Sequence, residues 1–202
     1  MSHEWCDFCI LTPVSLAVVF SVSPVLNNIK KYLETNLLAG LRTSPFRAPL
    51  KAWLLVPFYA LIALTVGFGS GLFQFEPLTS KMAFLLPLTL LVFPSLLEEA
   101  FFRGLLIPRN TAGHGRKYII LAVGGSTLLF VVWHPLGALT VNPGAIAIFF
   151  DPAFLLIVTA LGITCGYGYV VSKSLWVPVL IHWLTVVIWV LLLGGRNLVL
   201  EL

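Results

Sequence analysis

Residues 82–107, MAFLLPLTLLVFPSLLEEAFFRGLLI, combine a long apolar run with three charges. The first 16 residues, 82–97, are uncharged, but a membrane-spanning helix needs about 20 apolar residues. The apolar pattern continues to residue 107 around Glu98, Glu99 and Arg103. The stretch therefore predicts a membrane helix that carries three charged side chains.

The composition of the whole chain also indicates a membrane protein. Of its 202 residues, 59% are hydrophobic and only 10% are charged, whereas soluble domains carry about a quarter charged residues. The 12 Lys and Arg are scattered between apolar runs and form no basic patch, which argues against nucleic acid as a partner. The length allows one compact unit, so we expect a single integral-membrane domain over residues 1–202.

Five further charge-free intervals approach or exceed the length of one membrane span. They cover residues 8–29, 52–75, 118–150, 152–172 and 174–195. The 33 residues of 118–150 exceed one span, and a turn signal at Asn142–Gly144 divides them, which predicts a helix of about Tyr118–Leu139. The intervals lack the alternating pattern of barrel strands, and lipid requires every backbone group to be paired. The predicted fold is an all-α, polytopic transmembrane helical bundle of about six spans.

Two smaller patterns concern how the helices begin and pack. Asp151 precedes a proline and predicts the start of a helix in the outer interface. Gly162, Gly166 and Gly168 with Thr164 form a small-residue face, which predicts close helix packing. A substrate groove would need the same property.

The amino-terminal segment 9–26 is open to more than one interpretation. It lacks a basic n-region and a small-residue cleavage site, which argues against a signal peptide. We expect it to be the first span. Because Pro13, Pro24 and several serines interrupt it, a re-entrant or interfacial helix is the alternative.

Lysine and arginine side chains gather on one side of the predicted topology. The connections 27–51 and 103–117, together with Lys173, hold ten of the twelve. Lys81 and Arg196 fall on the other side, with the acidic amino terminus. Cytoplasmic connections carry an excess of Lys and Arg, so we expect both termini outside and the basic connections in the cytoplasm.

The charges at residues 98–103 are the first candidates for chemistry, since ionisable residues inside a bilayer are rare and usually functional. Glu99 and Arg103 are four apart on a helix, hence on one face and able to pair. Glu98 is turned by about 100° and points elsewhere, which leaves its carboxylate free to exchange a proton with water. A snorkelling charge cluster at a helix end is the alternative interpretation.

Two histidines, His134 and His182, also lie within predicted spans. Each alone is more often a hydrogen-bonding partner between helices than a catalytic group. With Glu98 they bring three chemically active side chains from three helices. Phe130 lies one turn before His134 on the same face, where its ring can fix the imidazole and shield it from lipid.

These residues, in this order, resemble the CPBP intramembrane proteases, a family that includes the Rce1-type CAAX prenyl endopeptidases and the bacterial Abi and bacteriocin-processing proteins. The Glu-Glu-x-x-x-Arg motif is Glu98, Glu99 and Arg103, the Phe-x-x-x-His motif is Phe130 and His134, and the last histidine is His182. The stretch 166–182 also looks like the carboxy-terminal portion of the family. The resemblance places the catalytic core at about residues 80–195 and implies an integral protein of the bacterial plasma (inner) membrane.

The resemblance implies a glutamate-dependent endopeptidase that cuts a membrane-associated protein or peptide. Glu98 and His134 would activate the attacking water, and His182 would stabilise the oxyanion. Glu99 and Arg103 would hold the helix and tune the local field. No cofactor is required on this mechanism, but Glu98, His134 and His182 are also ligand types for Zn²⁺, so a zinc mechanism stays open.

One position departs from the family pattern. The family commonly has Asn four residues after the last histidine as a second oxyanion donor, and here that position is Val186. We expect Thr185 or the indole of Trp189 to substitute, with loss of activity as the alternative.

The depth of the two histidines in the membrane raises a second question, because His134 lies roughly 10 Å deeper than His182 when residues are counted along the helices at about 1.5 Å each. Tilted helices or a different end of the fourth span are needed to bring them together.

Two other function classes fit parts of the sequence. An ion-coupled carrier would also hold acidic and histidine side chains inside a bundle, but no inverted repeat is visible. A non-catalytic scaffold or immunity protein on the same fold would account for Val186. The protease predicts that Glu98→Gln abolishes cleavage while the chain still inserts. The carrier predicts a flux in proteoliposomes, and the scaffold predicts no phenotype for Glu98→Gln.

Overall fold

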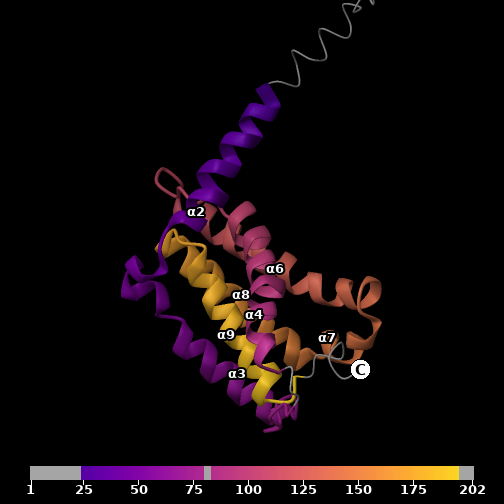
Figure 1. The fold of residues 1–202 in the computed structure, drawn as a ribbon. Helices are drawn as coiled ribbons and strands as arrows, with labels where there is room; N and C mark the ends of the chain where they lie inside the picture. The colour runs from indigo at the N-terminus through magenta and orange to yellow at the C-terminus, as the bar shows by residue number, and fades with distance from the viewer. Residues whose placement is uncertain (1–23, 80–82, 196–202) are drawn as a thin grey trace, which may run out of the picture.

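The computed structural model describes residues 24–79 and 83–195, and these form helices and connections without a β-strand (Figure 1). The longer elements are α3 (Val56–Ser70), α6 (Arg116–Thr140), α8 (Pro152–Ser172) and α9 (Trp176–Leu192). The shorter elements are η1 (Glu34–Leu38), α2 (Ala39–Arg42), η2 (Pro45–Arg47), η3 (Leu50–Trp53), η4 (Ala83–Leu85), α4 (Leu86–Leu90), η5 (Leu91–Leu96), α5 (Leu97–Glu99), η6 (Ala100–Leu105), η7 (Pro143–Ala145) and α7 (Ile146–Phe149).

Within the described residues, four continuous helical stretches are long and apolar enough to cross a membrane. They are Leu50–Ser70, Ala83–Leu105, Arg116–Thr140 and Pro152–Ser172, and α9 is a shorter apolar helix. These five stretches correspond to five of the six expected spans, which confirms the polytopic all-helical bundle. The expected first span, 9–26, lies almost entirely outside the described residues.

The central helix of the bundle is α8, which packs against α3, α6 and α9. The buried share of its apolar window is 56%, against 17–22% for the other three candidate spans. A Cβ added to Gly162 would lie 2.8 Å from Thr127 Cγ2, and one added to Gly166 would lie 2.8 Å from Val123 Cγ1. Both neighbours belong to α6, so the small residues do serve close helix packing, as predicted.

The stretch 83–105 is kinked in its middle, which the sequence did not predict. Phe93 has φ −129° and ψ 123°, outside the helical region, and it precedes Pro94. Proline lacks an N–H and disfavours the helical conformation of the residue before it. The helix resumes at once and carries the charged residues beyond the kink.

The predicted limits of α6 and the predicted start of α8 agree with the structure. α6 covers 116–140 against the predicted 118–139, and it ends before the turn at Asn142. Asp151 caps α8, because its carboxylate accepts the backbone N–H groups of Ala153 at 2.7 Å and Phe154 at 3.2 Å. The expected helix start at Asp151 is therefore confirmed.

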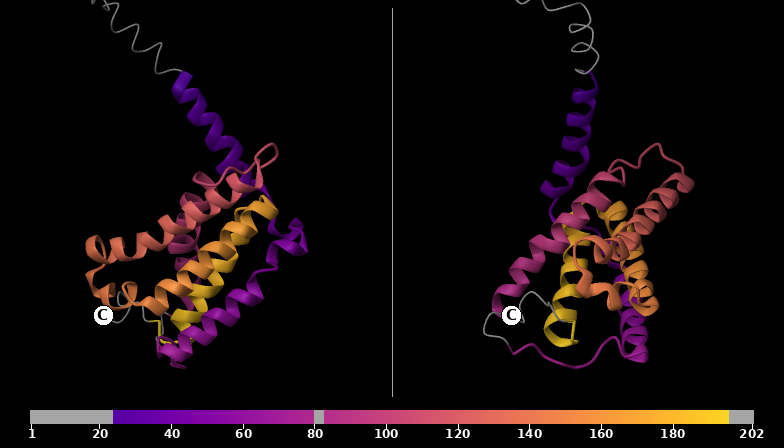
Figure 2. Two further views of the ribbon diagram at one scale, coloured as in Figure 1. Left: turned by 180° about the vertical axis from the view of Figure 1, so that it is seen from behind. Right: turned by 90° about the vertical axis from the view of Figure 1, so that its right-hand side faces the viewer.

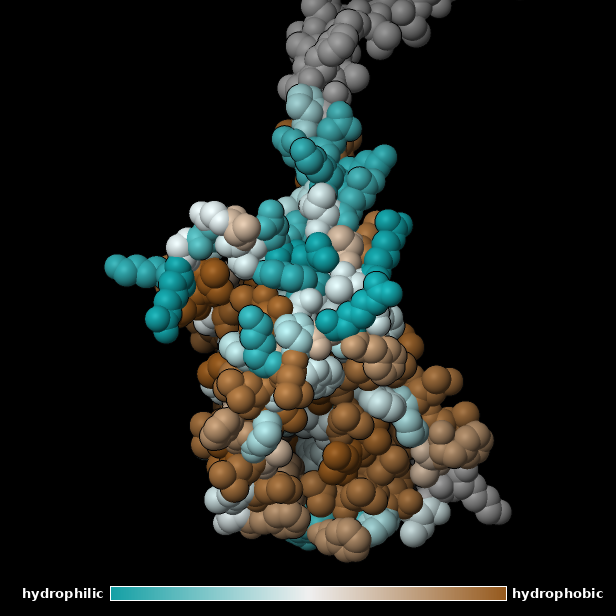
Figure 3. Space-filling view, turned by 90° about the vertical axis from the view of Figure 1, so that its left-hand side faces the viewer, coloured by the Kyte–Doolittle hydropathy of each residue, from teal (hydrophilic) through white to brown (hydrophobic). Residues whose placement is uncertain are grey.

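Hydrophilic side chains gather over one end of the molecule, while apolar side chains cover much of the remainder (Figure 3). Hydrogen bonds of Arg109 link the three basic segments that meet at this end. Its backbone N–H donates to Asn36 Oδ1 at 2.7 Å, and its guanidinium donates to Thr43 Oγ1 at 3.0 Å and to the carbonyl of Lys173 at 2.9 Å. The segments predicted to share one side of the membrane thus meet at one end. Which side that end faces stays a prediction.

Candidate active site

A buried ion pair forms the base of the site. Glu99 Oε1 accepts from Arg103 Nη1 at 2.9 Å, and both side chains are 0% exposed. Arg103 also donates to the carbonyl of Gly162 on α8 at 3.1 Å, and its guanidinium carbon lies 4.5 Å from the centre of the Phe130 ring. The pairing predicted from helical spacing is confirmed, and it ties the kinked helix to α6 and α8.

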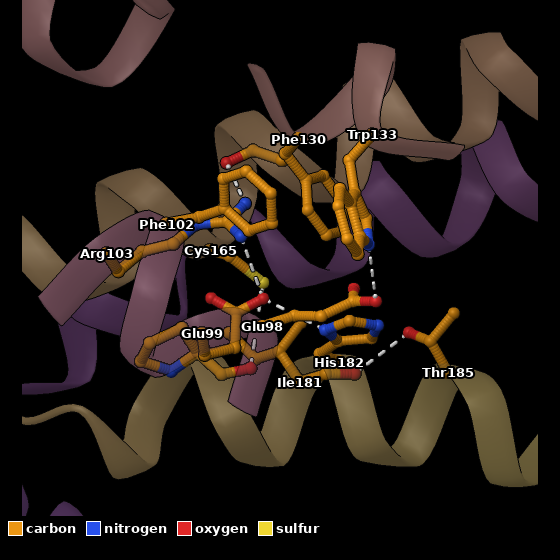
Figure 4. Close-up of polar contacts among 12 residues, drawn as sticks. Glu98, Glu99, Phe102, Arg103, Phe130, Trp133, Cys165, Ile181, His182 and Thr185 are labelled. Atoms are coloured by element: carbon orange, nitrogen blue, oxygen red, sulfur yellow. Dashed lines mark hydrogen bonds and ion pairs between the residues drawn. The ribbon is translucent and has the colours of Figure 1, made fainter. Parts of the chain in front are cut away.

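The same carboxylate also holds His182. Glu99 Oε1 lies 2.9 Å from His182 Nδ1, and the histidine is almost completely buried (Figure 4). The sequence did not predict this contact. Because Nδ1 is the ring atom engaged by the carboxylate, Nε2 is the atom left for a substrate.

Glu98 occupies a different environment from its neighbour. Its carboxylate accepts a hydrogen bond from the indole of Trp133 at 3.2 Å (Figure 4). The second oxygen, Oε2, is buried and has no hydrogen-bond partner among residues 24–79 and 83–195. Glu98 also lines a cavity of about 460 Å³. The two adjacent glutamates therefore separate as predicted, one held by an ion pair and one facing an open space.

His134 faces the same cavity from α6 and is held by its own helix. Its Nδ1 lies 2.8 Å from the carbonyl oxygen of Phe130, an acceptor, so Nδ1 carries the proton and Nε2 is left as an acceptor. Edge-to-face rings surround the imidazole, with centroid distances of 5.0 Å to Phe130, 5.3 Å to Phe149 and 5.4 Å to Phe154. The predicted packing of Phe130 on His134 is confirmed.

The two histidines meet across one ring. Phe130 lies 5.0 Å from His134 and 5.5 Å from His182, measured between ring centroids. Counting residues along the helices predicts that tilted helices or a different end of the fourth span must offset a depth difference of roughly 10 Å. The helices cross at an angle (Figure 2), and both imidazoles contact the Phe130 ring.

Apolar side chains form most of the cavity wall. Besides Glu98, His134 and His182, the wall includes Leu72, Phe73, Phe93, Pro94, Trp133, Gly137, Val141, Asn142, Phe149, Phe154, Ile157, Val158, Leu161, Thr185, Val186 and Trp189. Phe93 is 62% exposed and Trp133 is 43% exposed, so this wall continues to the outer surface of the bundle. A surface of this kind contacts lipid when the helices span a membrane.

Val186 stands where the family commonly has an Asn that donates to the oxyanion, and Thr185 and Trp189 are its expected substitutes. All three residues line this cavity. The Thr185 hydroxyl donates to the carbonyl of Ile181 at 2.9 Å and accepts from Tyr59 at 3.1 Å. The Nε1 of Trp189 is buried and has no partner within the described part of the chain. Val186 brings no hydrogen-bonding group to the wall.

Glu98, His134 and His182 are the residues through which the sequence leaves a zinc mechanism open. In the described ranges, 24–79 and 83–195, no three His, Cys, Asp or Glu side chains are placed so that they could hold a metal ion. His182 instead directs Nδ1 to Glu99.

Sequence reasoning missed several contributors to the site. Trp133 binds the carboxylate of Glu98, and Phe149 and Phe154 contact His134. Only Trp133 carried a usable signal, since it is a hydrogen-bond donor inside a predicted span next to a candidate catalytic histidine. The two phenylalanines look like any other apolar residues of a membrane segment.

Comparison with known proteins gave one match. Residues 80–188 match the family model described as type II CAAX prenyl endopeptidase Rce1-like, and this confirms the resemblance to the CPBP family. Searches of curated proteins and of solved structures found no match. The matched region holds both glutamates, Arg103, His134 and His182, and it covers 109 of the 202 residues. The chain belongs to the Rce1-like family of type II CAAX prenyl endopeptidases.

Proposed function

We propose that the chain is an intramembrane endopeptidase that uses Glu98 and His134 to add water to a peptide bond. The observation that carries this proposal is that Glu98 and His134 line one cavity, and that Glu98 Oε2 and His134 Nε2 are left as acceptors by the residues that the structure describes. An endopeptidase needs such a pair to take a proton from water.

The reaction divides into two balanced steps. Glu98 takes one proton from water while His134 Nε2 orients the other hydrogen, and the resulting hydroxide forms a bond to the carbonyl carbon. The carbonyl oxygen then carries the negative charge of the tetrahedral intermediate. In the second step the C–N bond breaks, and Glu98 returns its proton to the leaving nitrogen.

His182 fits the role of oxyanion donor. Its Nδ1 is engaged by Glu99, so an imidazolium at this position directs its Nε2–H to the oxyanion. Arg103 adds a second positive charge next to Glu99 and fixes that carboxylate. Glu99 and Arg103 therefore act as positioning residues behind the reacting groups.

The open wall of the cavity favours a membrane-associated protein or peptide as the substrate. Phe93 and Trp133 lie where the cavity reaches the outer surface of the bundle. A substrate that already lies in the bilayer reaches Glu98 along this wall without crossing water. Membrane lipid is the other expected partner.

The non-catalytic scaffold is the second candidate, and Val186 is the observation that favours it. Its side chain lines the cavity at the position where the family carries an amide donor. The scaffold has no need for that donor, whereas the protease needs a substitute.

Comparison of protein termini across the host membrane proteome tests the proposed function. The strains carry the wild-type protein, Glu98→Gln, or Glu76→Gln at matched abundance. Glu76→Gln is the control, because it makes the same chemical change at an exposed residue outside the cavity. We expect new termini with wild type and with the control, and their loss with Glu98→Gln. Identical termini in all three strains would favour the scaffold.

A further inference from the structure

A second cavity lies at the hydrophilic end of the molecule and shares no lining residue with the active-site cavity. It has a volume of about 480 Å³ and is lined by Glu34, Thr35, Ala39, Arg109, Asn110 and Lys173. Two of these side chains are cations and one is a carboxylate. The cavity contributes nothing to the proposed peptidase chemistry.

Arg109 is fixed at this cavity by three hydrogen bonds. Its backbone N–H donates to Asn36 Oδ1, its Nε donates to the carbonyl of Lys173, and one terminal nitrogen donates to Thr43 Oγ1. Every acceptor is neutral. The guanidinium is therefore held in place without compensation of its charge.

Lys173 is held beside Arg109 in an unfavourable conformation. Its φ is +60°, and among the described residues it is the only non-glycine residue with a positive φ. Its ammonium donates to Thr111 Oγ1 at 2.5 Å. Burial, and then the nearby charge of Arg109, lower the pKa of Lys173. The left-handed conformation of Lys173 ends α8 as its C-cap, and it places the lysine next to the like charge of Arg109.

No anion within the described residues neutralises these two cations. Glu34 lines the cavity, but neither Arg109 nor Lys173 forms an ion pair with it or with another carboxylate of residues 24–79 and 83–195. Asn110 adds an amide beside them, with its oxygen already accepting from the backbone of Ala112 at 3.1 Å. The cavity thus presents positive charge and hydrogen-bond donors together.

We propose that this cavity binds a phosphate-class oxyanion through Arg109 and Lys173. A planar guanidinium next to an ammonium is a common arrangement for phosphoryl oxygens. Two sources share this chemistry: the headgroup of an anionic phospholipid at the membrane surface, and a soluble phosphate ester. This inference does not depend on the proposed peptidase function.

Thermal unfolding of the purified full-length chain in a neutral detergent tests the proposal. The probes are inorganic phosphate, dioctanoyl phosphatidylglycerol and dioctanoyl phosphatidylcholine, at constant ionic strength. We expect a saturable rise in Tm with phosphate, with phosphatidylglycerol, or with both. A response to the lipid alone assigns the site to a headgroup, and a response to phosphate alone assigns it to a soluble ester. A response to phosphatidylcholine as large as that to phosphatidylglycerol, or no saturable response, would overturn the proposal.

Three variants show whether the response comes from this cavity. Arg109→Gln is expected to weaken binding at least tenfold, but Arg109 also joins three segments, so this variant could fail to fold. Lys173→Gly keeps Arg109 and relieves the positive φ, and we expect it to fold and to lose at least tenfold in affinity. Arg116→Gln removes an exposed charge outside the cavity and should bind like wild type. Wild-type affinity in Lys173→Gly, or equal loss in Arg116→Gln, contradicts the proposal.

Discussion

Glu99 and His182 are joined by a 2.9 Å contact between Oε1 and Nδ1, although 83 positions separate them in the sequence. The same oxygen accepts from Arg103 on its own helix at 2.9 Å. One buried carboxylate thus links the kinked helix to α9 and orients the imidazole at the cavity. We expect this group to contribute to both stability and catalysis.

Removing one member of the Glu99–Arg103 pair should be more damaging than removing both. Breaking a buried ion pair leaves an uncompensated charge and typically costs about 3–5 kcal/mol, whereas replacing both partners by apolar residues is often nearly neutral. We expect Glu99→Leu and Arg103→Met to lower the Tm in detergent strongly. The double variant should unfold at a higher temperature than either. Additive losses in the double variant would show that the two charges are not coupled.

The fold was more predictable from the sequence than the site. Charge-free intervals located the described spans, since lipid tolerates few charges, and helical spacing paired Glu99 with Arg103. The kink was not predictable, because Pro135 lies inside a continuous helix whereas Pro94 follows a break, and only packing distinguishes the two. The contacts of His182 with Glu99 and of Trp133 with Glu98 join residues on different helices. The periodicity of apolar residues describes one helix at a time, so it cannot predict contacts between residues on different helices.

Trp133 is expected to position Glu98 for catalysis. Its indole donates to Glu98 at 3.2 Å, so Trp133→Phe removes one hydrogen bond and keeps an aromatic ring at the wall. We expect kcat to fall at least tenfold, as for the loss of one hydrogen bond of about 1.5–3 kcal/mol to a charged group, with KM little changed. The assay uses a peptide around the cleavage site found by the comparison of termini.

The control for this experiment is Trp183→Phe. Trp183 donates to the carbonyl of Pro87 at 2.7 Å and does not line the active-site cavity. This variant also loses one indole hydrogen bond, here to a backbone carbonyl outside the site, so its kcat should match that of wild type. Equal effects of the two substitutions would mean that Trp133 has only a structural role.

Val186→Asn is expected to raise activity. The position faces the cavity, so an amide there adds a donor for the oxyanion. Oxyanion donors are worth roughly 10²–10³ in kcat, and we expect at least a tenfold gain because Trp189 or Thr185 already supplies part of this function.

Val186→Leu is the matched control, since it changes the size of the side chain without adding a donor. No gain with Asn would indicate that the oxyanion lies out of reach of this position. An inactive wild type that gains cleavage only with Val186→Asn would identify the natural chain as a scaffold that has lost its peptidase activity.

Trp189 and Thr185 are the two residues expected to replace the missing amide, and the structure gives a reason to rank them. The Thr185 hydroxyl already donates to Ile181, whereas Trp189 Nε1 has no partner among the described residues. Trp189→Phe should therefore lower kcat about tenfold or more, and Thr185→Val should lower it less. Thr185→Val keeps the shape of the side chain and Trp189→Phe keeps an aromatic ring, and Tm measurements check that both variants fold. A larger effect of Thr185→Val would reverse the ranking and assign the donor to the Tyr59–Thr185 pair. Unchanged kcat in both would show that neither residue substitutes, leaving His182 as the oxyanion donor of this site.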